Sequence, residues 1–243
     1  MAVSIDNVYQ RVLALANKEQ RGYITPQEFN LLASKAQNDI FEAYFHEIGT
    51  SRLTSGNDTE YSDELNILRE KISPFEKWKV GMSALNNTNE LTLPTSTTVH
   101  KLGTVFYAAG SYDVIVDVVD KKDLHYMERN GKTSPTARRP VYVRKTNSII
   151  KLFPASPTVS YSVSNVTCNY IAKPADPKWT YVVVNDKALY NSSDASKQDF
   201  DLHASEESTL VNSILELAGI ITAKPGLSEV AIRNEQMKVE NRK

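Results

Sequence analysis

The side chains that could support catalysis or hold a metal are few and widely spaced. The chain has one cysteine and four histidines (His46, His100, His125 and His203), without the close spacing of metal ligands. Cys168 alternates with Val166 and Tyr170 in a strand-like run, which predicts a small buried side chain and not a nucleophile. Glycine-rich phosphate loops, a nucleophile elbow and the H-E-x-x-H pattern are absent from the sequence. We therefore expect no enzymatic activity, no catalytic or metal-binding residue and no cofactor.

The most informative charged feature is a basic segment over residues 129–145. It holds six cations and no acidic residue: Arg129, Lys132, Arg138, Arg139, Arg144 and Lys145. Such a segment can contact phosphates or an acidic protein surface, or it can be a solvated loop. DNA binding is the less favoured reading, because neither a recognition helix nor stacking aromatics accompany it.

An acidic run near the end of the chain is a candidate counterpart for the basic segment on a neighbouring copy. Its members are Asp199, Asp201, Glu206 and Glu207. For Glu206 and Glu207 there is also a simpler interpretation, since acidic residues at a helix start are stabilised by the helix dipole.

The composition is that of an ordinary folded chain. Its 243 residues are 41% hydrophobic, and 28 Lys and Arg against 29 Asp and Glu give a formal charge of −1. These values exclude disordered, collagen-like and coiled-coil proteins, and the whole chain lacks the basic charge of a nucleic-acid binder. One cysteine cannot form an intrachain disulfide, so a reducing compartment is expected. We expect neither secretion nor membrane insertion, because no apolar stretch reaches signal-peptide or membrane-span length.

Helical periodicity dominates the first part of the chain. Three helices are predicted, over residues 5–21, 26–49 and about 62–72. The second has the best specified start, because Thr25 can cap it, Pro26 suits the first helical position and Glu28 completes a capping box. Gly49 is its predicted end.

Between Phe75 and about His203 the apolar period changes to two, which predicts strands. They are expected at residues 78–84, 105–107, 114–118, 141–144, 148–153, 166–172, 179–184, 188–190 and 200–202. The second and third read as a hairpin around Gly110. A short helix over 121–130, capped by Asp120, interrupts the strands.

Helical spacing returns after Ser205, the predicted cap of a helix that ends before Pro225. The last segment, Ser228 to Lys243, is mostly polar, with Val230, Met237 and Val239 as its possible anchors. It is predicted to be marginal alone and to serve as a partner-docking tail.

The order of elements predicts an α+β fold, in which N- and C-terminal helices pack together and a central antiparallel β-rich module projects between them. The expected divisions are an N-terminal helical part (1–74), a β-rich module with one short helix (75–204), and C-terminal helices with the tail (205–243). The helical parts are expected to form one unit.

Five segments, in order, give the chain a resemblance to a known family. They are residues 13–45, 102–127, 134–144 (SPTARRPVYVR), 173–184 (KPADPKWTYVVV) and 199–225. Together they resemble the ring or adaptor proteins of head-to-tail connectors in crAss-like and related short-tailed phages. No single segment carries chemistry, so the resemblance points to a structural family without an active site.

The resemblance implies a virion protein at the head-to-tail interface, assembled in the host cytoplasm. Copies of the chain, about twelve by analogy, would close a ring between portal and tail, leaving a channel through which genomic DNA passes without specific binding. Implied partners are neighbouring copies, the portal protein and other connector or tail proteins; no membrane is implied. The C-terminal segment, Ser228 to Lys243, would dock onto the portal. The position in the stack of rings stays open, as does whether the basic segment faces the lumen or a neighbour.

Two other functions are compatible with the sequence. The first is a carbohydrate- or ligand-binding β module with helical additions, suggested by Trp78, Trp179 and twelve tyrosines. The second is a hydrolase whose carboxylates and histidines come together only in the fold.

Overall fold

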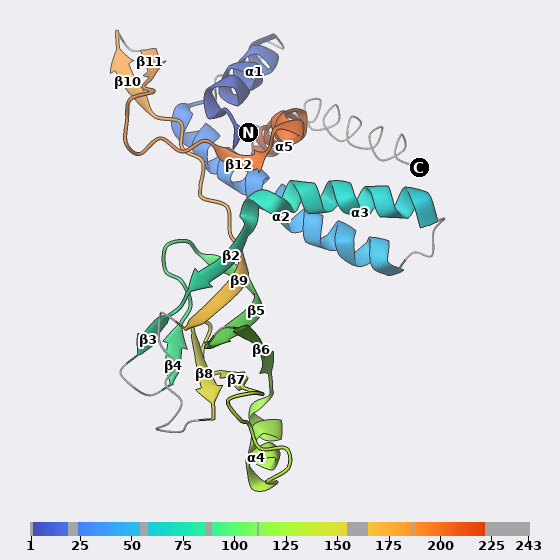
Figure 1. Cartoon of the computed structure of the whole chain (residues 1–243). Helices are drawn as coiled ribbons and strands as arrows, with labels where there is room; N and C mark the ends of the chain where they lie inside the picture. The colour runs from blue at the N-terminus through green and yellow to red at the C-terminus, as the bar shows by residue number, and fades with distance from the viewer. Residues whose placement is uncertain are drawn as a thin grey trace. The chain divides into compact units, whose positions relative to one another are not determined.

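The computed structural model of the chain describes residues 2–18, 24–53, 58–85, 89–110, 112–154, 165–185 and 187–221. It has the expected α+β fold and divides into two compact units (Figure 1). Residues 1–74 and 174–243 form the first, here called the helical unit, and residues 75–173 form the second, the β unit.

The second boundary corrects the expected extent of the β-rich module. That module was predicted to reach residue 204, whereas the β unit ends at Lys173. Hydrogen bonds explain the difference: Asn30 Nδ2 donates to the Trp179 carbonyl at 3.1 Å, and Gln37 Nε2 donates to the Ala175 carbonyl at 2.7 Å. The last strands therefore belong with the helices.

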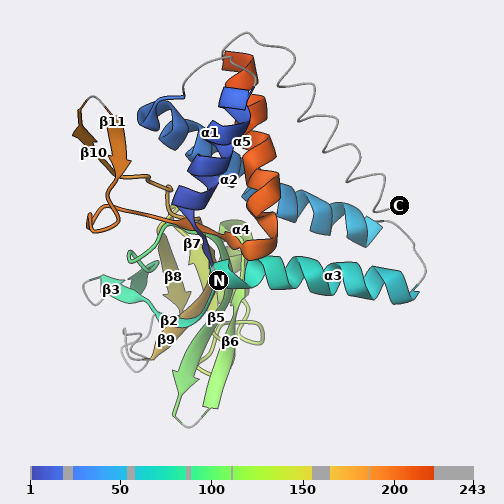
Figure 2. The same ribbon diagram turned by 90° about the horizontal axis from the view of Figure 1, so that it is seen from above.

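Among its described residues, the helical unit has four α-helices and two small sheets. The helices are α1 (Ile5–Lys18), α2 (Pro26–Leu53), α3 (Asp58–Ile72) and α5 (Glu207–Ile221), and the 3-10 turn η1 (Ser73–Phe75) follows α3. Helix α5 contacts α1 and α2, and α3 contacts α2, which confirms that N- and C-terminal helices pack together (Figure 2). One sheet pairs β1 (Ala2–Val3) with β12 (Phe200–His203), and the other pairs β10 (Tyr181–Val184) with β11 (Lys187–Tyr190).

The predicted capping box at the start of α2 is confirmed. Thr25 N donates to Glu28 Oε2 at 2.9 Å, and Glu28 N donates to Thr25 Oγ1 at 3.3 Å. The predicted stop at Gly49 is wrong, since α2 continues to Leu53. Glycine inside a helix costs only about 1 kcal/mol relative to alanine, which the rest of a long helix can offset.

Of two other predicted caps, Ser205 is wrong, whereas Asp120 is correct in position but not in side-chain hydrogen bonding. Ser205 lies inside a 3-10 turn, η2 (Ala204–Glu206), which precedes α5; the side chain of His203 caps this turn by accepting from Ser205 N at 3.3 Å. Asp120 does occupy the N-cap position of α4 (Lys121–Arg129), but its side chain makes no capping hydrogen bond. Its backbone carbonyl instead accepts from Leu124 N at 2.9 Å.

In the described part of the β unit, eight strands form one sheet in the order β2-β9-β5-β6-β7-β8-β4-β3. The strands are β2 (Glu76–Gly81), β3 (Ser83–Leu85), β4 (Glu90–Thr92), β5 (Val99–Ala109), β6 (Tyr112–Val118), β7 (Val141–Arg144), β8 (Ile149–Phe153) and β9 (Val166–Ala172). All neighbours are antiparallel except β6 and β7, which are parallel. The predicted hairpin is confirmed as β5–β6, where Gly110 has a positive φ of 79°.

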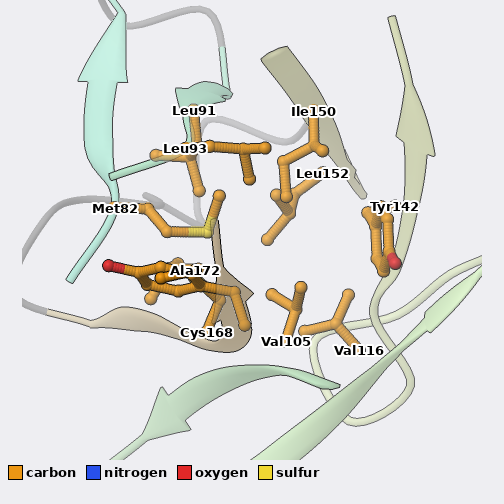
Figure 3. Close-up of a cluster of buried hydrophobic side chains, with 12 residues drawn as sticks. Met82, Leu91, Leu93, Val105, Val116, Tyr142, Ile150, Leu152, Cys168 and Ala172 are labelled. Carbon is orange, nitrogen blue, oxygen red and sulfur yellow. The ribbon is translucent and has the colours of Figure 1, made fainter. Parts of the chain in front are cut away.

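The core of the β unit lies inside the curl of this sheet. Side chains from most of its strands point toward one another there, together with Met82 between β2 and β3 (Figure 3). The strand residues include Leu91, Val105, Val116, Ile150, Leu152 and Cys168. A smaller core of Leu124, Val141 and Val143 lies where α4 meets β7. The alternating pattern of the sequence thus corresponds to an inner, apolar sheet face.

Candidate interaction surfaces

The centre of the basic segment is a tight turn between α4 and β7. Thr136 and Arg139 exchange two backbone hydrogen bonds, of 3.3 and 3.0 Å, so Ala137 and Arg138 form its tip. Pro135 and Pro140 flank the turn and are buried, whereas Arg138 and Arg139 are exposed. Two anchored prolines therefore hold the two guanidinium side chains out into solvent.

The six cations of the segment fall into two groups. Lys145 Nζ pairs with Glu90 Oε1 at 2.8 Å, and Arg144 Nη2 donates to the Asn147 carbonyl at 3.2 Å. The other four are exposed, and within the described part of the chain no ion pair joins them to an acid: Arg129, Lys132, Arg138 and Arg139. These four are the cations available to a partner, and we call them the basic turn.

The proposed acidic counterpart is used within its own unit. Asp199 Oδ1 accepts from Ile5 N at 3.1 Å, and Asp201 Oδ2 accepts from Ala175 N at 2.8 Å. Glu206 is buried, with its side chain paired with Lys71, and Glu207 Oε1 lies 3.3 Å from Arg11 Nη1. The prediction of a free acidic surface is therefore wrong. Glu206 in particular is buried and cannot contact a neighbouring copy.

Charge is nevertheless separated between the two units. The β unit carries 13 Lys and Arg against 7 Asp and Glu, a formal charge of +6. The helical unit carries 15 against 22, a formal charge of −7. The near-zero charge of the chain thus conceals two oppositely charged bodies. Counting charges by segment could have found this, had the second boundary been placed at residue 173.

A second surface, not foreseen from the sequence, is the β10–β11 hairpin of the helical unit. Its base is anchored, because the rings of Tyr181 and Tyr190 stack on buried Trp179 with centroids 5.8 and 5.7 Å away. Its outer part is apolar and between 46% and 61% exposed: Val182, Val183, Val184 and Leu189. The strands themselves were predicted, but a strand pattern does not reveal that both faces of a hairpin stay open to solvent.

The two tryptophans differ in their surroundings. Trp179 is 2% exposed, and its Nε1 donates to Asp6 Oδ1 at 2.9 Å, so it is a core residue and its proposed role in ligand binding is wrong. Trp78 is 72% exposed and lies 6.2 Å from the Phe106 ring, measured between centroids. Lys79 stands over Phe106 and pairs with Asp113. Of the two tryptophans, Trp78 alone is available for ligand stacking.

The residues considered first for chemistry are dispersed. Cys168 is fully buried, as predicted, and burial raises the pKa of its thiol to about 11. His46, His100 and His125 are exposed on α2, β5 and α4, while His203 caps η2. Among the described residues, no three His, Cys, Asp or Glu side chains are grouped closely enough to hold a metal ion.

Two further expectations concern membranes and the tail. None of the described helices combines the length and the apolar character needed to cross a bilayer. The tail anchors Val230, Met237 and Val239 lie outside the described residues.

No protein-family model matches the chain, and a search of curated proteins found no match.

Proposed function

We propose that the chain is a non-enzymatic structural subunit of a phage head-to-tail connector. In this proposal, copies close into a ring between portal and tail and leave a channel for DNA passage. The resemblance of five ordered segments to connector ring and adaptor proteins supports this proposal. The observation that carries the proposal on physical grounds is the separation of charge, +6 on the β unit and −7 on the helical unit.

Opposite charges on two bodies of one chain favour a particular kind of self-association. Contacts between like units repel, whereas contact between the β unit of one copy and the helical unit of the next attracts. Such an interface is heterologous, because it joins two different surfaces, and repeated copies close into a ring when the rotation between them allows it. The charge pattern supports contact between unlike units, as in a head-to-tail ring, over a dimer joined through like units.

The basic turn is the part of the β unit best placed for such a contact. Its exposed guanidinium and ammonium groups have no described acidic partner within the unit, so approaching acids replace water without breaking an existing ion pair. Exposed charges of this kind act over about 8 Å at physiological salt. They would guide and orient neighbouring copies more than they would hold them together.

A second candidate function is ligand binding at Trp78. An exposed tryptophan beside a phenylalanine is a surface on which a sugar ring can stack. Titration of the protein with soluble glycans separates the two functions: a saturable change in Trp78 fluorescence supports ligand binding. Unchanged emission removes this alternative.

Native mass spectrometry tests the proposed function. The full chain is measured alone and after mixing with the portal protein of the same phage. A single closed oligomer, on its own or on the portal, is the expected result. A chain that remains monomeric in both samples would contradict the proposal.

A further inference from the structure

In the described part of the chain, two strand edges are open and poorly protected. In β6, residues 112–116 pair with β5 on one side, while β7 joins β6 only at Asp117 and Val118. In the β10–β11 hairpin, the two strands pair only with each other in the described part of the chain. Each edge therefore presents backbone groups to which another strand can bond.

Natural proteins usually protect such edges with charged side chains or proline. Strand β10 has neither, and the open stretch of β6 has one acid, Asp113, which pairs with Lys79. Large apolar side chains are exposed on both: Val183 is 61% exposed and Ile115 is 59% exposed. Open edges with apolar side chains and little free charge are typical of strands that meet a partner.

From these features we infer that the β10–β11 hairpin of one copy adds to the open edge of β6 in the next copy. The occupant is a second copy of this chain, because the hairpin belongs to the unit of charge −7 and β6 to the unit of charge +6. The inference rests on the head-to-tail association proposed above and names its contact.

The dimensions and the stoichiometry agree with this pairing. Strands β10 and β11 have four residues each, and the open stretch of β6 has five. Each copy carries one hairpin and one β6 edge, so in a closed ring every hairpin has one receiving edge. The stacking of Tyr181 and Tyr190 on Trp179 fixes the base of the hairpin, which lowers the entropy lost when it docks.

Cross-linking between differently tagged copies of the full chain tests the contact. One copy carries Val183→Cys and the other Ile115→Cys, and a short bis-maleimide joins cysteines that lie close together. Cys168 does not compete, because it is fully buried and its pKa is raised to about 11. The matched control replaces Val183→Cys with Asn66→Cys, at an exposed position of α3.

We expect the Val183–Ile115 pair to give at least about tenfold more cross-linked heterodimer than the control, because only the proposed contact would hold the two cysteines close together. If the wild-type chain forms a ring but the cysteine pair reacts no better than the control, the hairpin contact is overturned and the proposed function stands. Absence of any wild-type oligomer, with or without portal protein, would contradict both. Cross-linking of the hairpin to the portal instead would also overturn the inference.

A pair of variants provides a second readout. Val183→Asp combined with Leu189→Asp places charge on the exposed part of the hairpin, whereas Val183→Thr keeps the shape and strand preference of valine. The aspartate pair should raise the concentration needed for assembly at least about tenfold, with an unchanged circular dichroism spectrum, because both positions are more than half exposed. Unchanged assembly in the aspartate pair would contradict the contact.

Discussion

Lys71 Nζ lies 2.6 Å from Glu206 Oε1, and this ion pair joins the end of α3 to the turn η2 that precedes α5. Both side chains are nearly excluded from water, at 12% and 8% exposure. Lys71 also stands over the ring of Tyr44, with Nζ 5.8 Å from its centroid. The pair therefore links an N-terminal helix to the C-terminal one inside the helical unit.

Removing one member of this pair should destabilise the chain strongly. Lys71→Met leaves the Glu206 carboxylate without its cation in a nearly dry site, and the expected loss is about 3 kcal/mol of unfolding free energy. Urea denaturation followed by circular dichroism measures this loss. The double variant Lys71→Met/Glu206→Met should recover most of it, since no uncompensated charge remains. A single variant as stable as the wild type would show that the pair is not a structural contact.

The two tryptophans should differ in how much stability the same substitution removes. Trp179→Phe removes the hydrogen bond to Asp6 and part of the ring stack under the hairpin, so we expect a loss of about 1–3 kcal/mol. Trp78→Phe should stay within about 0.5 kcal/mol of the wild type, because Trp78 is exposed. Acrylamide quenching provides the check: emission should be strongly quenched in the Trp179→Phe variant and protected in the Trp78→Phe variant. The reverse order would contradict the burial of Trp179.

The thiol of Cys168 should make stability depend on alkaline pH. The folded pKa of about 11 lies above the ordinary value of 9.0, so between these values the folded chain holds more protons than the unfolded chain. Stability is therefore fully present below about pH 9 and falls as the pH rises toward 11, by at most about 1.4 kcal/mol per pH unit. Denaturation of the wild type and of Cys168→Ala at several pH values measures the difference. Burial also raises the pKa of Tyr142, but both proteins contain Tyr142, so it does not contribute to the difference between them. Equal slopes would contradict an ionisable, buried thiol.

Reversing the charge of the basic turn should weaken assembly. Arg138→Glu with Arg139→Glu lowers the charge of the β unit by four, and the loss should be largest at low salt, where exposed charges are least screened. The control Arg138→Lys with Arg139→Lys keeps the charge and should assemble normally. Sedimentation velocity at several salt concentrations gives the comparison. Assembly that is unaffected by the reversal would point instead to a solvent-facing or lumen-facing turn.

Local features of the fold could be predicted from the sequence. The strands at 141–144 and 166–172 match β7 and β9 to the residue. In β9 the reason is clear, because alternation with one buried face is a strong signal. The capping box of α2 was equally clear, since Thr25 and Glu28 are close in sequence.

What could not be predicted depends on contacts between distant segments. A strand pattern at 179–184 does not say which sheet or unit the strand joins; Asn30 and Gln37 decide that through their hydrogen bonds to the chain around Trp179. Likewise, an acidic run in the sequence does not reveal its partners. The sequence predicts Glu206 at the surface, whereas its side chain is buried against Lys71.

Electron microscopy of the purified chain, alone and mixed with portal protein, at low and high salt, tests the proposed head-to-tail association most directly. Closed rings of a single copy number are expected at low salt, with the β unit of each subunit against the helical unit of the next. Monomers under all conditions, or two-fold dimers joined through like units, would contradict it.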